Sequence, residues 1–223
     1  MAHAALDDQG GSNLRQQVLE RVRTGIVSGR TTPGTIFSVP TLSADLGVST
    51  TPVREALLEL ARDGLVTPMR NRGFRVEPMS VADLDNLFAL RELVETFALE
   101  TLARMRITDT DELRECADAV GVAVAANDVP RYVATDRAFH AALVLRANNP
   151  RLTRLVLALR DDMRLYGIDS PEGRERQLAS VGEHYEMIDV AVRGDVASAA
   201  PLMSRHIMSW KPLFIAALKS ATP

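Results

Sequence analysis

Residues 42–57 read LSADLGVSTTPVREAL, and this stretch decides the fold of the first third of the chain. Two leucines one turn apart predict a short helix over residues 40–46, which Gly47 ends by accepting a left-handed backbone. A second helix begins shortly afterwards, with Ser49 or Thr51 as its cap. The pattern is typical of two helices joined by a tight turn.

The flanking sequence extends this motif in both directions. Apolar residues at four-residue spacing predict an amphipathic helix over residues 13–28. On the other side, residues 65–67 and 74–77 are short β-type segments, and the connection 68–73 contains Pro and Gly. A helix-turn-helix followed by a two-stranded hairpin predicts a winged helix.

Polar side chains lie where such a domain would contact DNA. The second helix of a helix-turn-helix presents its first residues to the major groove, and a wing reaches the neighbouring minor groove. The alternative is a simple helix cap with solvated arginines nearby. The DNA-binding candidates are Ser49, Thr50, Thr51 and Arg54 on the helix, and Arg70, Arg72 and Gly73 in the loop.

Residues 42–57, followed by Gly64-Leu65-Val66 and Asn71-Arg72-Gly73, closely resemble the GntR family of bacterial transcription regulators. The resemblance covers nearly all of residues 12–78. It implies a symmetric dimer that binds a double-stranded DNA operator with an inverted repeat, with the wing glycine near the minor groove. Many members have Arg where this chain has Thr50, and often another near Pro40, so the base contacts are expected to differ.

The pattern changes at Ser80 to long helical segments with brief interruptions. The predicted fold is mainly α: a winged helix-turn-helix at residues 12–78 and an all-α, six-helix antiparallel bundle at residues 79–220, after a disordered tail at residues 1–11. The six expected helices span residues 80–106, 109–126, 129–147, 151–168, 171–193 and 195–219.

Three of the four histidines lie on apolar stripes of these helices. Asp136 and His140 are one turn apart, so their side chains can point to the same place inside a bundle. With His184 and His206 they offer one carboxylate and three imidazoles, which suit a divalent ion such as Zn, Ni, Mn or Fe. Any single one is more often a hydrogen-bonded core histidine, but the combination favours a metal site.

Three further segments look like the ligand-binding FCD domain of the FadR subfamily: residues 136–140 (DRAFH), 183–188 (EHYEMI) and 203–207 (MSRHI). This resemblance spans roughly residues 82–218. It implies that Asp136, His140, His184 and His206 are the metal ligands, with open positions for a small carboxylate effector. Six helices rather than seven suggest the VanR-like branch.

Arg91 lies on an apolar stripe, where a permanently charged guanidinium needs an anion. An effector carboxylate and a structural pair with Glu95 are equally good partners. Tyr132, Arg164 and Tyr166 are further candidates for the same cavity.

Composition limits the remaining possibilities. The net charge of −3 argues against a protein that coats nucleic acid nonspecifically. The single cysteine, Cys116, fits a reducing cytoplasm, and the longest apolar run, residues 119–126, is far shorter than the roughly 20 residues of a membrane span. We expect a homodimeric, cytoplasmic repressor rather than an enzyme. A metal-dependent enzyme and a sensor of the metal itself remain alternatives, although Thr35 stands where a phosphate-binding loop requires Lys.

Overall fold

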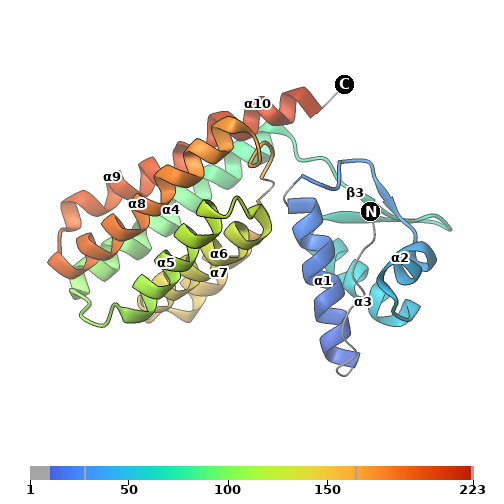
Figure 1. The fold of residues 1–223 in the computed structure, drawn as a ribbon, viewed down its shortest axis with the longest axis horizontal. Helices are drawn as coiled ribbons and strands as arrows, with labels where there is room; N and C mark the ends of the chain where they lie inside the picture. Colours follow the sequence, from blue (N-terminus) through green and yellow to red (C-terminus); the bar gives the residue numbers. More distant parts are fainter. Residues whose placement is uncertain (1–10, 28, 164, 222–223) are drawn as a thin grey trace. The chain divides into compact units, whose positions relative to one another are not determined.

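The computed structural model describes residues 11–27, 29–163 and 165–221, and the chain divides into two compact units, Met1–Met79 and Ser80–Pro223 (Figure 1). The expected tail lies outside the described residues up to position 10, and Gly11 is already the first residue of a helix. Arg164 also lies outside them.

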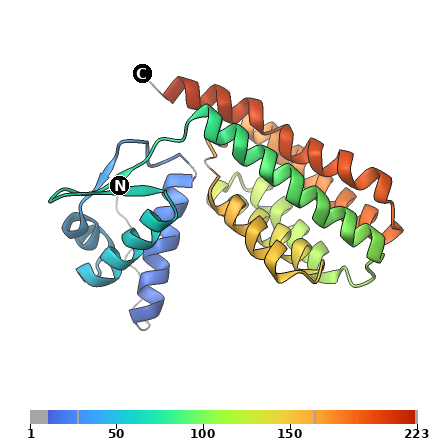
Figure 2. The same ribbon diagram turned by 180° about the vertical axis from the view of Figure 1, so that it is seen from behind.

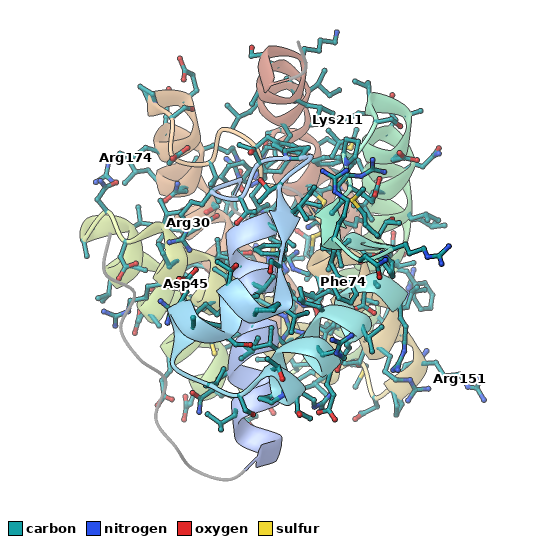
Figure 3. All side chains as sticks on the ribbon, turned by 90° about the vertical axis from the view of Figure 1, so that its right-hand side faces the viewer. Arg30, Asp45, Phe74, Arg151, Arg174 and Lys211 are labelled. Atoms are coloured by element: carbon teal, nitrogen blue, oxygen red, sulfur yellow. The ribbon has the colours of Figure 1, made fainter. Side chains whose placement is uncertain are left out.

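The first unit is a winged helix. Its elements are α1 (Gly11–Val27), β1 (Ile36–Phe37), α2 (Val39–Leu46), α3 (Thr50–Arg62), β2 (Val66–Met69) and β3 (Gly73–Val76). Helix α1 packs against α3, and the apolar faces of all three helices meet the sheet in one core. Phe74, labelled in Figure 3, is buried in that core from β3. Gly47 ends α2 with a φ of 69°, as the sequence predicts.

Strand β1 was not expected from the sequence. The three strands form an antiparallel sheet in the order β1-β3-β2, in which Phe37 pairs with Phe74. A strand of two residues is too short to show an alternating apolar pattern, so the sequence contains no pattern that predicts it. Strand β1 limits which residue can stand at position 73. Gly73 has a φ of +111° and lies directly against the carbonyl of Phe37, which leaves no room for a side chain.

The secondary-structure elements described in the second unit are all helices. Its helices are α4 (Val81–Met105), α5 (Asp111–Ala125), α6 (Val129–Leu145), α7 (Pro150–Asp161), α8 (Pro171–Arg193), α9 (Val196–Met208) and α10 (Lys211–Ala221). Side chains at or next to the ends of the predicted helices cap the helices that follow: Ser80 forms a capping box with Asp83, and Asp128, Asn149, Ser170 and Asp195 each accept at least one backbone hydrogen bond.

Two of the predicted helices are shorter than expected. The segment 195–219 is divided at Ser209 and Trp210 into α9 and α10, so this unit has seven described helices rather than six, and the helix count no longer favours the VanR-like branch. Pro212 explains the division, because its ring has no N–H to donate and would clash with the carbonyl four residues earlier. Helix α7 ends at Asp161 rather than residue 168, and Gly167 has a φ of 73° that no helix contains.

Helix α4 is central to this bundle. It packs against α9, α8 and α7, while α5 packs against α6 and α8 (Figures 1 and 2). Arg151 extends outward from the first turn of α7 (Figure 3). Among the described residues, no helix has both the length and the apolar character that a membrane crossing requires.

Replacing Gly73 by Ala is expected to destabilise the wing. A Cβ there would lie 2.1 Å from the Phe37 oxygen, and the positive φ adds strain of about 1–3 kcal/mol. Gly34→Ala is the matched control, because Gly34 has a φ of +84° but no atom lies within 4 Å of the position that its added Cβ would take. Hydrogen exchange of the full chain should show faster exchange at the β1–β3 amides for Gly73→Ala than for the control. Equal exchange in both variants would contradict the close approach.

Candidate functional site

The first residues of α3 form an exposed polar surface. Ser49, Thr50, Thr51 and Arg54 are all exposed, while Val53, Ala56 and Leu57 on the opposite side are buried in the core. Ser49 occupies the cap position, yet its side chain makes no capping hydrogen bond. The hydroxyl and guanidinium groups of this helix end are therefore available to an external partner.

The wing presents a second exposed group of cations. Arg70, Asn71 and Arg72 form the turn between β2 and β3, and both arginines are exposed. Asn71 has a φ of 58°, a left-handed conformation that asparagine tolerates, and Gly73 follows at the start of β3. The predicted DNA-binding residues thus lie on two exposed features of one unit, the start of α3 and the tip of the wing.

Asp136, His140, His184 and His206 converge in the second unit from α6, α8 and α9. One ligand-type atom from each of the four lies within 4.8 Å of the others. His140 Nε2 is 3.2 Å from His206 Nε2, and His184 Nε2 is 3.4 Å from Asp136 Oδ1. Two ligand atoms about 2.1 Å from one ion lie about 3.0–3.4 Å apart, so these separations suit a shared cation.

The surroundings of His184 show most clearly whether a cation fits between the four residues. Its side chain is fully buried, and neither ring nitrogen has a hydrogen-bond partner among the described residues. Its ring stacks on Phe139 with centroids 4.1 Å apart, which fixes the orientation of the imidazole. An unsatisfied buried polar group is costly, and a metal ion on Nε2 would remove that cost for one of the two nitrogens.

Carboxylates behind the other two imidazoles fix which nitrogen faces the centre. His206 Nδ1 lies 2.7 Å from Glu183 Oε2, and His140 Nδ1 lies 3.4 Å from Glu95 Oε2. Because a carboxylate only accepts hydrogen bonds, it favours the tautomer in which Nδ1 carries the proton and Nε2 keeps its lone pair. Two lone pairs then face each other across 3.2 Å, an arrangement that a cation stabilises.

Arg160 of α7 joins the site to α4. It donates to Asp136 Oδ2 at 2.5 Å and to Glu95 Oε2 at 2.8 Å, while Arg91 donates to Glu95 Oε1 at 2.9 Å. Arg91 therefore has the structural partner that was one of its two expected alternatives, and its contact with an effector stays a prediction. Tyr132 and Tyr166 are buried in the same unit.

The pKa directions favour metal ligation at neutral pH. Burial lowers the pKa of His140 well below its usual value, and the charge of Arg160 lowers it further. Burial also lowers the pKa of His206 to about 4. Burial alone would raise the pKa of Asp136, but Arg160 holds it well below the ordinary range. The groups are thus two neutral imidazoles and one carboxylate, the forms that bind metals.

Sequence reasoning named Glu95 only as a possible partner of Arg91, and it assigned no role to Arg160 or Glu183. Glu183 precedes a predicted ligand, and Arg160 and Glu95 are charged residues on helices with apolar faces, so a weak signal existed. Their pairing spans 65 residues of sequence and depends on how α4 and α7 pack.

Each of the two units matches a known protein family. Residues 14–76 match the family model of bacterial regulatory proteins of the gntR family, and residues 86–209, more than half of the chain, match the FCD domain. The chain belongs to the GntR family of bacterial transcription regulators.

Individual transcription regulators are similar to more than half of the chain. An HTH-type transcriptional regulator of Streptomyces ambofaciens is 30% identical over 204 residues, which cover 88% of this chain and 83% of that protein. The gluconate operon transcriptional repressor of Bacillus subtilis is 30% identical over 129 residues, 57% of this chain and 53% of that one. A GntR regulator from Rhodococcus sp. RHA1 has a TM-score of 0.73 at 25% identity, covering 92% and 99% of the two chains.

Metal titration tests the four-residue cluster of this GntR protein. We expect the wild type to bind one zinc ion and His184→Ala to bind it at least about 100-fold more weakly, because one of four ligands is lost. Phe139→Leu, which removes only the ring stacked on His184, is expected to cost less than about tenfold. Equal zinc affinity of His184→Ala and wild type would make His184 an ordinary core histidine.

Proposed function

We propose that this GntR regulator is a repressor that binds an inverted-repeat operator as a homodimer, and that a small carboxylate bound with a metal ion in the FCD domain changes its operator affinity. The observation that carries the proposal is the convergence of Asp136 and three buried histidines, one of which makes no hydrogen bond among the described residues. The name of the gluconate operon repressor supports repression.

DNA binding is supported by the exposed residues of the first unit. Exposed hydroxyls and Arg54 at the start of α3 suit contacts with phosphates and base edges, and Arg70 and Arg72 suit a minor groove. The unit is small, and one winged helix contacts too few base pairs for tight specificity. A two-fold dimer doubles the contact and requires a two-fold site.

Helix α4 supports the homodimer. Leu90, Leu93 and Phe97 follow one another at three- and four-residue spacing, and each side chain is at least half exposed. A continuous apolar stripe of this kind is typical of a surface that another molecule covers. We assign this stripe to a second copy of the chain, because α4 directly follows the winged helix in the sequence. Pairing of two chains through α4 would therefore join two winged helices in one dimer.

To test this function, the purified protein is first used to select its binding sites from a pool of random DNA duplexes. Affinity for the selected site is then measured with zinc, after chelation, and with a panel of organic acids. Inverted repeats and an affinity that changes with acid only in the presence of zinc support the proposal. A change with zinc alone identifies a metal sensor. Turnover of an acid identifies an enzyme.

Arg54→Ala is expected to weaken specific DNA binding by about 1–3 kcal/mol, because one phosphate or base contact is lost. Arg62→Ala is the control, since Arg62 is exposed at the opposite end of the same helix. Affinities at fixed salt, with melting curves of both variants, measure the difference. If the two variants bind the selected site equally well, Arg54 does not contact DNA.

Leu93→Glu is expected to turn the dimer into a monomer, because a charge in an apolar interface must be buried without a partner. Leu178→Glu on α8 is the control, since Leu178 is similarly exposed but outside the α4 stripe. Sedimentation velocity of both variants distinguishes them. A dimeric Leu93→Glu would place the interface elsewhere.

A further inference from the structure

The buried charges around the metal ligands are balanced among themselves. Three carboxylates lie there, and each is paired with arginine: Glu95 with Arg91 and Arg160, Asp136 with Arg160, and Glu183 with Arg176. Three guanidinium groups therefore offset three carboxylates. Arg205 also lies 3.9 Å from Glu183 Oε1, but its side chain is 56% exposed and pairs more closely, at 2.7 Å, with the exposed Glu186. Glu186 and solvent therefore offset its charge.

The histidines add no charge to this balance when they ligate a metal. An imidazole nitrogen must be deprotonated to bind a cation, so His140, His184 and His206 contribute lone pairs only. A divalent ion at the cluster then brings two positive charges that no protein group offsets. In a site whose carboxylates lacked arginine partners, those carboxylates would offset the ion themselves.

Asp136 is the most solvent-exposed of the four cluster residues. The Asp136 side chain is 17% exposed, whereas those of the three histidines are at most 3% exposed. An anion can therefore approach beside Asp136 and Arg160, where it meets a guanidinium as well as the cation. A buried, unbalanced double charge is costly, and the partner that removes it completely carries two negative charges.

We propose that the metal site of this protein selects a dicarboxylate over a monocarboxylate of the same shape, because arginine already neutralises every carboxylate around it. Arg160 is the residue that sets this selectivity, since it is the only one of the three arginines that pairs directly with a metal ligand among the described residues. The inference rests on the proposed function and adds the charge of the effector to it.

Calorimetry of the zinc-loaded wild type tests the selectivity. The probes are malonate, succinate and glutarate, each compared with its half-amide, which keeps the shape and loses one charge. We expect at least one dicarboxylate to bind at least about tenfold more tightly than its half-amide. Equal affinities, no binding of any dicarboxylate, or tighter binding of inorganic phosphate than of all three would overturn the inference.

Substitution of Arg160 separates charge from structure. Arg160→Met removes one positive charge and should reduce the preference for the dicarboxylate to less than about threefold. It should also raise zinc affinity, because Asp136 is no longer neutralised, whereas a merely structural role would lower it. Arg160→Lys keeps the charge and should keep the preference. Lower zinc affinity or an unchanged preference in a folded Arg160→Met protein would overturn the role of Arg160.

Arg137→Met is the matched control. Arg137 on α6 pairs with Asp161 on α7, so the same two helices lose one positive charge outside the cluster, and wild-type preference is expected. The wild-type measurements do not depend on the folding of any variant. Absence of zinc binding by the wild type would overturn the proposed function as well, whereas zinc binding without a charge preference would overturn this inference alone.

Discussion

The guanidinium of Arg160, held between Asp136 and Glu95, is the interaction on which the interior of the helical unit depends. It joins α7 to α6 and α4 inside a core from which water is largely excluded. Buried ion pairs of this kind contribute little net stability, because desolvation offsets the attraction. Removal of one partner is costly, however, so the three helices are held in one specific arrangement.

This constraint also shapes the site. With one oxygen of Asp136 bound by Arg160, only the other oxygen faces the imidazoles. Glu183 and Glu95 orient the remaining ligands from behind, and Phe139 orients His184 by stacking. The same groups that allow charges to be buried therefore bring three imidazole rings and one carboxylate oxygen close together.

Local features of the sequence predict what local physics determines. Gly47 and the residues after it predict the helix-turn-helix, because caps and turns depend on neighbours in the chain. The spacing of Asp136 and His140 places both on one helix face. Strand β1 is too short to show an alternating apolar pattern. The break between α9 and α10 depends on Pro212, but the apolar stripe continues across it and hides the break in the sequence. The pairing of Arg160 with Glu95 depends on helix packing, which sequence spacing alone does not determine.

X-ray absorption spectroscopy of the zinc-loaded full chain tests the central claim most directly, that one carboxylate and three imidazoles bind a common cation. The account predicts nitrogen and oxygen neighbours at about 2.0–2.1 Å, with the outer-shell scattering of three imidazole rings. A sulfur neighbour at about 2.3 Å, or scattering from fewer than three imidazoles, would contradict it, because zinc would then be bound elsewhere in the protein.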